Sequence, residues 1–253
     1  MEIKDSVVVI TGGAQGLGFA MAQRFAGKGA NIALIDANAE QLATAVNELS
    51  SIAPQVCGYV ANITDEQAVK ETFESIVHDL GKVNVLVNNA GILRDGLMIK
   101  AKDGEILDEM SLDQFNAVIN VNLSGTFVCG KEAAKAMITT KQQGVIINIS
   151  SVARDGNMGQ SNYSAAKAGV ASLAMVWAKE LARYNIRAAA IAPGACYSAM
   201  TASMKLEALQ RLENMAPARR LGQDYEIAQS AQFIVENDFY NGKVLAVDGG
   251  LVL

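Results

Sequence analysis

Residues 7–18 read Val7-Val8-Val9-Ile10-Thr11-Gly12-Gly13-Ala14-Gln15-Gly16-Leu17-Gly18 and lead into a helix-forming run, Phe19–Lys28. The β-branched run predicts a buried strand, and glycines after it let the backbone turn tightly and approach a pyrophosphate. The helix that follows would offer its amino terminus to that charge. The spacing Gly-x-x-x-Gly-x-Gly differs from the Gly-x-Gly-x-x-Gly fingerprint, so a plain glycine-rich turn is the alternative. The candidate cofactor contacts here are Gly12, Gln15, Gly16, Leu17 and Gly18.

Apolar runs of the same kind recur along the chain and alternate with helical stretches. Continuous apolar strands separated by helices are typical of a parallel sheet covered on both faces. The sequence therefore predicts a doubly wound α/β fold that binds its ligands at the carboxyl ends of the strands. The expected strands are Val7–Ile10, Asn31–Ile35, Val56–Val60, Val83–Val87, Val145–Ile149, Arg187–Ile191 and Lys243–Val247.

Composition narrows the class of protein. The 253 residues are 51% hydrophobic and contain no linker-like segment, so we expect one domain over residues 1–253. No apolar run approaches the ~20 residues of a membrane helix, and residues 1–5 do not look like a signal peptide, which predicts a cytoplasmic protein without a membrane partner. A net charge of −5 disfavours a nucleic-acid partner. Three cysteines and one histidine, His78, favour reduced thiols and no metal site.

The second predicted strand runs into Asp36, some 20 residues past the glycines, where a carboxylate can bind a ribose 2′-hydroxyl. The alternative is that Asp36 caps the next helix. Binding the 2′-phosphate of NADP usually requires a cation, and the two positions that could supply it hold Gln15 and Ala37. The cofactor is therefore predicted to be NAD(H).

Two further strand ends carry small and amide residues. Asn62 and Ile63 follow the third strand, and Asn89, Ala90 and Gly91 follow the fourth. Such residues can line an adenine or ribose pocket, although turn chemistry explains Asn and Gly equally well. Further on, a Met-rich segment at 200–215 is compatible with a mobile lid or with a peripheral helix.

Tyr163 and Lys167 lie four residues apart in a helical run, so they share one face. An ammonium beside a phenol favours the phenolate and lowers a pKa that is ordinarily about 10, which would suit acid-base catalysis. The alternative is a surface pair on an amphipathic helix. The fifth strand ends in Ser150-Ser151, and a hydroxyl there could bind one substrate oxygen together with Tyr163, which suits carbonyl reduction. Serine after a strand is otherwise an ordinary helix cap or turn residue. Asn122 places an amide in an apolar helical run, where it needs a partner.

These motifs, in this order, resemble the short-chain dehydrogenase/reductase family over nearly the whole chain. Residues 11–18 resemble its cofactor loop and residues 88–91 its Asn-Asn-Ala-Gly motif. Pro193-Gly194 resembles the loop that touches the nicotinamide, with Cys196 and Ser198 at cofactor-contacting positions. The resemblance implies strand order 3-2-1-4-5-6-7 and a homotetramer.

The family's catalytic tetrad corresponds to Asn122, Ser151, Tyr163 and Lys167. By this resemblance Tyr163 exchanges the proton, Lys167 lowers its pKa and holds the ribose, Ser151 orients the substrate oxygen, and Asn122 holds a water for proton relay. The interval from Ser151 to Tyr163 is one residue shorter than usual, so counting back selects Ser150. We favour Ser151 because a strand end fixes side-chain direction, whereas a loop absorbs deletions.

The sequences of residues 91–95 and 156–163 are most similar to those of 3-oxoacyl reductases that act on acyl-carrier-protein or coenzyme A thioesters. Gln142 and Tyr184 stand where carrier-protein reductases have arginines. The interval from Gly91 to Asn122 is longer than usual, with the excess around Lys100–Met110. This segment is compatible with a solvated turn and short helix, and we expect it to shape substrate entry or a subunit contact.

The sequence thus predicts an NAD(H)-dependent oxidoreductase that moves a hydride between the cofactor and a carbonyl or secondary alcohol. A 3-oxoacyl thioester is the favoured substrate, and a polyol, a hydroxysteroid or a small hydroxy acid is the alternative. A non-catalytic nucleotide-sensing protein is the rival from another class, because fold does not fix function.

Overall fold

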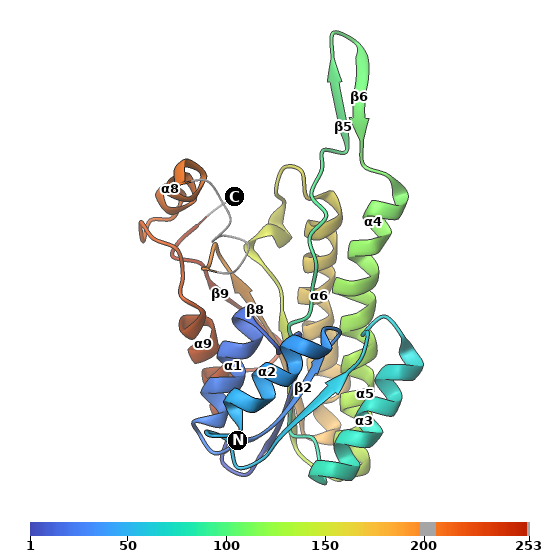
Figure 1. The fold of residues 1–253 in the computed structure, drawn as a ribbon, viewed down its shortest axis with the longest axis vertical. Coiled ribbons are helices and arrows are strands. Elements are labelled where there is room, and N and C mark those ends of the chain that lie inside the picture. The colour runs from blue at the N-terminus through green and yellow to red at the C-terminus, as the bar shows by residue number, and fades with distance from the viewer. Residues whose placement is uncertain (198–205, 252–253) are drawn as a thin grey trace.

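A parallel sheet of seven strands forms the centre of the computed structural model, which describes residues 1–197 and 206–251 (Figure 1). Its order is β3-β2-β1-β4-β7-β8-β9. Since β5 and β6 form a separate pair, this is the predicted order 3-2-1-4-5-6-7, which is confirmed. The strands of the sheet are β1 (Val7–Thr11), β2 (Asn31–Asp36), β3 (Val56–Val60), β4 (Val85–Asn88), β7 (Gly144–Ile149), β8 (Ile186–Pro193) and β9 (Val244–Val247).

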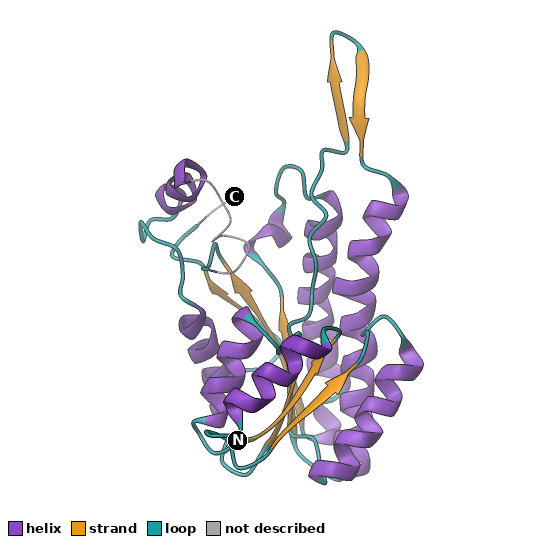
Figure 2. Cartoon of the chain, in the orientation of Figure 1, coloured by secondary structure: helices purple, strands orange, loops and turns teal. Residues whose placement is uncertain are grey.

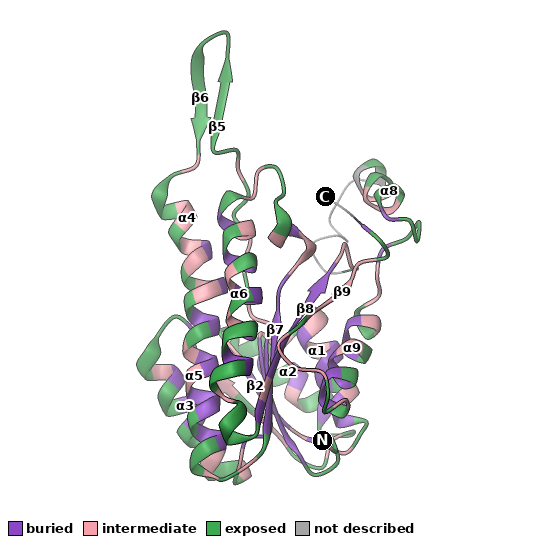
Figure 3. Ribbon diagram, turned by 180° about the vertical axis from the view of Figure 1, so that it is seen from behind, coloured by how far each residue is buried: buried purple, intermediate pink, exposed green. Residues whose placement is uncertain are grey.

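Helices cover both faces of the sheet, as the continuous apolar strands predict. Val8 and Ile10 of β1 pack on one side, and Val7 and Val9 pack on the other. Burial of each such side chain contributes roughly 1.5–3 kcal/mol. Figure 3 shows buried strands between helices whose outer surfaces are exposed. The first side is covered by α1 (Gly16–Ala26), α2 (Ala39–Leu49) and α9 (Asp224–Glu236), and the second by α3 (Glu66–Leu80), α5 (Thr126–Thr139) and α6 (Ser161–Glu180).

Shorter elements complete the described chain. A π-helical turn, η1 (Asn120–Gly125), joins α4 (Leu112–Ile119) to α5. Two 3₁₀ turns are η2 (Val152–Asp155) and η3 (Ala182–Tyr184). Part of the Met-rich segment forms a peripheral helix, α8 (Leu206–Met215), whereas residues 198–205 lie outside the described part. Within the described residues, no helix has the length and apolar character needed to cross a bilayer.

The added segment between β4 and α4 is a β-hairpin, and not the solvated turn and short helix with which its composition is also compatible. Strands β5 (Ile99–Lys102) and β6 (Glu105–Glu109) pair antiparallel and project away from the other elements (Figure 2). Asp103 and Gly104 join them, with φ of +53° and +86°. Two positive φ angles define a type I′ turn, whose twist matches that of the strands. The sequence feature that predicts this hairpin is the Asp-Gly pair between two runs in which apolar and charged residues alternate.

Candidate active site

Two adjoining cavities lie at the carboxyl ends of the strands. The first has a volume of about 360 Å³ and the second about 330 Å³. Asn89, Gly91 and Ile92 line both of them, so the two form one continuous site. This is where a doubly wound sheet is expected to bind its ligand.

The glycine loop after β1 has little room for side chains. Gly12 has φ of +60°, and a Cβ there would lie 2.9 Å from the Cα of Ala90. At Gly18 a Cβ would lie 2.2 Å from the Gly12 carbonyl oxygen. These glycines therefore let β1, the loop and α1 pack against the end of β4.

Helix α1 begins without a side-chain cap. Gln15 at its N-cap makes no capping hydrogen bond, and its first turn holds no acidic residue. By contrast, Asn38 caps α2 and Asp65 caps α3 through their side chains. The backbone N–H groups at the start of α1 are thus available to an anion, and the helix dipole favours one. The cradle fits the pyrophosphate of a dinucleotide.

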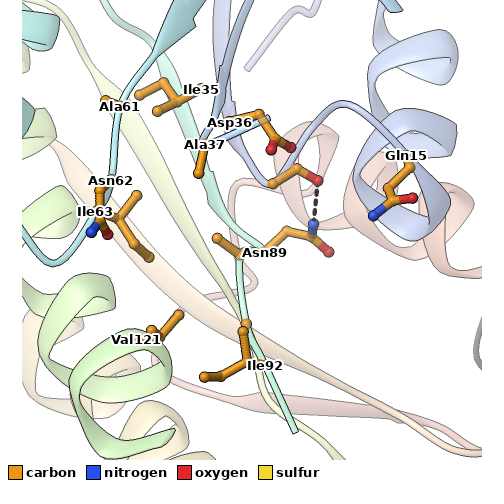
Figure 4. Close-up of a pocket in the computed structure, with 13 residues that line it drawn as sticks. Gln15, Ile35, Asp36, Ala37, Ala61, Asn62, Ile63, Asn89, Ile92 and Val121 are labelled. Carbon is orange, nitrogen blue, oxygen red and sulfur yellow. Dashed lines mark hydrogen bonds between the residues drawn. The ribbon is translucent and has the colours of Figure 1, made fainter. Parts of the chain in front are cut away.

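Asn89 ties the glycine loop to β4. Its Nδ2 donates to the carbonyl oxygens of Gly12 at 2.9 Å and Thr11 at 3.2 Å. The dashed line at Asn89 in Figure 4 marks the bond to the Gly12 carbonyl. In return, the Thr11 hydroxyl accepts from the backbone N–H groups of Asn89 and Ala90. The motif residues after β4 therefore shape the site through the backbone.

Asp36 faces the first cavity from the end of β2 (Figure 4). One carboxylate oxygen accepts from the Ala14 N–H at 3.2 Å, and the other accepts from the Asn38 N–H at 3.0 Å. Because Asn38 caps α2, Asp36 is not the helix cap. Among the described residues lining this cavity, Asp36 is the one charged side chain.

Ser151, Tyr163 and Lys167 line the second cavity together. Ser151 follows β7, whereas Tyr163 and Lys167 stand on the first turns of α6. The Lys167 ammonium lies 5.5 Å from the centre of the Tyr163 ring and donates to the Ile149 carbonyl oxygen at 2.7 Å. The predicted helical face is therefore turned into the cavity and is not a surface pair.

The pKa values in this cavity differ from the expectation. Burial raises the pKa of Tyr163, a hydrogen bond with the Ser151 hydroxyl opposes the rise, and the charge of Asp95 adds to it. Burial lowers the pKa of Lys167 to about 8. For the chain by itself the pKa of the phenol is therefore raised and not lowered as predicted, and desolvation is the largest cause.

Buried Lys167 gives a pH-dependent stability that a variant can reveal. Between pH 8 and 10.5 the unfolded lysine keeps a proton that the folded one has lost, so the free energy of unfolding rises with pH. Lys167→Met removes this dependence. Between pH 7 and 10, the free energy of unfolding measured in urea should rise less for the variant than for the wild type, by up to about 3 kcal/mol. Equal rises would contradict the burial of a charged lysine.

The two candidate serines have different surroundings. Ser150 is 2% exposed, and its hydroxyl donates to the Lys167 carbonyl oxygen at 2.8 Å. Ser151 caps η2 by accepting from the Ala153 N–H at 3.1 Å, and its hydroxyl reaches the Tyr163 phenol. Ser150 therefore supports the helix that carries Lys167, whereas Ser151 reaches the group expected to react.

Ser151→Ala should lower kcat/KM for carbonyl reduction more than Ser150→Ala does, because only the first change removes a hydroxyl beside the phenol. A lost hydrogen bond to a developing charge costs about 10²–10³ in rate. Steady-state kinetics of both variants, with thermal melting to detect the loss of the Ser150 contact, test this order. The reverse order would select Ser150.

Asn122 is fully buried in η1 and lines neither cavity. Its Oδ1 accepts from the Ile92 N–H at 2.8 Å, and its Nδ2 donates to the Ile92 carbonyl oxygen at 3.0 Å. This pair of bonds satisfies the amide expected to need a partner. Asn122 thereby fixes Ile92, which lines both cavities.

Most of the predicted cofactor residues line one of the cavities. Gly12, Gln15, Asp36, Ala37, Asn62, Ile63, Asn89, Ala90 and Gly91 line the first, and Leu17, Gly91, Tyr163, Lys167, Pro193, Gly194 and Cys196 line the second. Gly16 and Gly18 shape the loop without lining a cavity, and Ser198 lies outside the described residues. Apolar wall residues were missed, namely Ile35, Ala61, Ile92, Leu93, Val121 and Ile149. In the sequence, only their position at the end of a predicted strand indicates that Ile35, Ala61 and Ile149 could line the site.

A nucleotide cradle that continues into a pocket with a phenol, an ammonium and a hydroxyl defines a Rossmann-type oxidoreductase. The family model for the short chain dehydrogenase matches residues 6–208. The chain belongs to the short-chain dehydrogenase family, whose members typically use a nicotinamide cofactor.

Several known proteins are similar over their whole length. A 3-oxoacyl-[acyl-carrier-protein] reductase from Thermotoga maritima is 39% identical and is covered, like this chain, over 100% of its length. The (2S)-[(R)-hydroxy(phenyl)methyl]succinyl-CoA dehydrogenase subunit BbsD from Thauera aromatica is 36% identical, over 99% of this chain and 98% of that protein. A crystal structure of a candidate gluconate dehydrogenase from Agrobacterium tumefaciens matches with a TM-score of 0.91 and 30% identity, over 99% of this chain and 97% of that one.

Proposed function

We propose that this protein is an NAD(H)-dependent reductase of 3-oxoacyl thioesters, forming the 3-hydroxyacyl product. The observation that carries the proposal is the shared lining of the second cavity by Ser151, Tyr163 and Lys167, beside a nucleotide cavity that contains Asp36. A nucleotide-sensing protein needs the cradle but has no need for these three groups around one open space.

The proposed chemistry follows from the side chains in the second cavity. Tyr163 donates a proton to the substrate carbonyl oxygen, and the Ser151 hydroxyl binds the same oxygen and orients it. A raised pKa keeps the phenol protonated at neutral pH, which is the form that reduction requires. A bound nicotinamide supplies the hydride. In the reverse direction Tyr163 takes the proton from the alcohol.

Lys167 and Asn122 act beside the reacting atoms in this proposal. The Lys167 ammonium, held by the Ile149 carbonyl, would bind the nicotinamide ribose and stabilise the phenolate that remains after proton donation. Asn122 holds Ile92 at the junction of the two cavities. The role of Asn122 in a water-mediated proton relay stays a prediction.

The choice of substrate rests on the relatives. The similar proteins from Thermotoga maritima and Thauera aromatica are named for a 3-oxoacyl carrier thioester and for a hydroxyacyl coenzyme A substrate. A thioester with an oxygen at C3 is common to both names. The similar crystal structure named for gluconate supports a sugar acid as the second candidate. The cytoplasmic location and the homotetramer expected from the sequence belong to this proposal as well.

A substrate panel tests the proposal. With NADH, acetoacetyl-coenzyme A should give the highest kcat/KM, above 5-ketogluconate, simple ketones and steroid ketones, and polyols should be poor substrates with NAD. A higher value for the sugar acid would move the assignment to the second candidate. NADH binding without turnover on any member would support the sensing protein.

A further inference from the structure

Asn162, the residue before Tyr163, is a fully buried polar side chain that the proposed reaction does not use. Its amide makes three hydrogen bonds. Nδ2 donates to the carbonyl oxygens of Arg94 at 2.9 Å and Gln114 at 3.4 Å, and Oδ1 accepts from the N–H of Tyr163 at 2.7 Å. These partners lie in three segments, which are the loop after β4, helix α4 and the first turn of α6. One side chain therefore joins the backbone of Tyr163 to two other parts of the fold.

The start of α6 lacks an ordinary side-chain cap. Gln160 at its N-cap makes no capping hydrogen bond, and its Nε2 donates instead to Asp95 at 2.9 Å. The first four N–H groups of a helix have no acceptor inside the helix, and that of Tyr163 is one of them. Asn is a poor helix former because its side chain bonds to nearby backbone groups, and here that property supplies the missing acceptor. Asn162 thus fixes the turn that carries the phenol.

The same junction includes the wall of the second cavity. In the loop after β4, the N–H of Gly96 donates to the Gly159 carbonyl oxygen at 2.8 Å, just before α6 begins. Leu93, in the same loop, lines the second cavity together with Tyr163. Helices α4 and α6 lie side by side, so the contact of Asn162 with α4 supports the arrangement from the other side (Figures 1 and 3). The cavity wall and the phenol are therefore held together at the amide of Asn162.

The next turn of α6 has its own support, because Ser150 donates to the Lys167 carbonyl and Lys167 donates to the Ile149 carbonyl. Those bonds fix Lys167 but do not reach the first turn, where helices ordinarily fray. A reacting group displaced by about 1 Å can lower a rate about 10²-fold. We propose that Asn162 is a positioning residue, whose amide holds the Tyr163 phenol in its place in the second cavity. The inference rests on the proposed function, since it concerns the phenol as proton donor.

A split between turnover and cofactor binding tests this role. Asn162→Ala removes all three bonds and should lower kcat by about 10–10². The affinity for NADH should stay nearly that of the wild type, because neither Asn162 nor the carbonyls to which it donates line the first cavity.

The matched control is Asn84→Ala. Asn84 is also buried, and its Oδ1 accepts from the Val7 N–H at 3.0 Å, at the amino ends of the strands and away from the site. Thermal melting should show a loss of stability for both variants, whereas the control should keep the wild-type kcat. An unchanged kcat for Asn162→Ala, or an equal loss in both variants, would overturn the proposal.

A second variant, Asn162→Asp, keeps the size of the side chain and tests the donated bond to Arg94. The ionised carboxylate cannot donate to the Arg94 carbonyl, whereas the protonated acid can. Burial raises the pKa of such a carboxyl, so it takes up its proton at a higher pH than an exposed one. The ratio of its kcat to that of the wild type should therefore rise between about pH 8 and about pH 5.5. The ratio for Asn162→Ala should stay constant over this range, and a constant ratio for both variants would contradict the proposal.

The amide of Tyr163 gives a readout that does not depend on turnover. Labelling with ¹⁵N-tyrosine gives signals from six residues, and the signal that Tyr163→Phe removes belongs to Tyr163. Loss of its acceptor in Asn162→Ala should speed hydrogen exchange at this amide by up to about tenfold, whereas Asn84→Ala should leave it unchanged.

The two readouts separate this inference from the proposed function. Unchanged exchange at the Tyr163 amide in Asn162→Ala, or faster exchange with undiminished kcat, would overturn the positioning role of Asn162. A wild type that reduces no carbonyl compound would overturn the proposed function, and faster exchange in the variant would still show that Asn162 fixes Tyr163.

Discussion

Replacing Tyr163 by phenylalanine should lower turnover in carbonyl reduction by about 10²–10⁴, the contribution of a positioned acid. The change removes one hydroxyl and leaves the ring in contact with Lys167 and the cavity wall, so the fold should be retained. The proton must then come from water, which the half-buried position of the phenol makes unfavourable. Single-turnover measurements at saturating NADH isolate this step.

The control for this variant is Tyr184→Phe. Tyr184 is 38% exposed in η3, and its hydroxyl accepts from Arg183, away from both cavities. Tyr184→Phe should retain wild-type turnover, and both variants should bind NADH with nearly the wild-type affinity in a fluorescence titration. Near-normal turnover of Tyr163→Phe would remove the phenol from the mechanism.

NAD(H) should be preferred over NADP(H) by at least about tenfold in kcat/KM, a difference of about 1.4 kcal/mol. Asp36 faces the first cavity, and its two oxygens already accept from Ala14 and Asn38, which fixes their direction. They can accept further bonds from ribose hydroxyls, whereas a 2′-phosphate would bring like charge to the same place.

The double variant Asp36→Ala with Ala37→Arg should narrow or reverse this ratio. It removes the carboxylate and supplies a cation that can bind the phosphate in a bidentate manner. Asp36→Asn is the matched control, because it keeps the size of the side chain and one acceptor oxygen. It should remove the repulsion of the NADP 2′-phosphate without adding a cation that attracts it. Equal use of both cofactors by the wild type would show that Asp36 does not bind the ribose.

The sheet was predictable because its signals are local and repeated. Each strand from Val7 to Val247 is a short, largely apolar run, and the alternation with helices leaves few arrangements that bury both faces. The strand order itself came from the family resemblance. Most residues that line the two cavities were predictable for the same reason, since the fold brings the carboxyl ends of the strands to one edge of the sheet.

The remaining differences have physical reasons. The hairpin was missed because its charged residues are equally typical of a solvated segment, although Asp103-Gly104 is a strong turn signal. The pKa of Tyr163 was given the wrong direction, because sequence spacing locates an ammonium but says nothing of the desolvation that dominates in the cavity. The bonds from Asn122 to Ile92 join residues 30 apart in the sequence, and Asn122 lies in a π-helical turn that no local sequence pattern predicts.

Transfer of a label from the cofactor to the substrate is the most direct test of the proposed reaction. The protein is incubated with NADH that carries deuterium at both C4 positions and with acetoacetyl-coenzyme A, and the product is analysed by mass spectrometry. The account predicts one deuterium at C3 of 3-hydroxybutyryl-coenzyme A, formed by the wild type and at a rate about 10²–10⁴ lower by Tyr163→Phe. NADH oxidation without deuterium in the product, or no product while NADH remains bound, would contradict it.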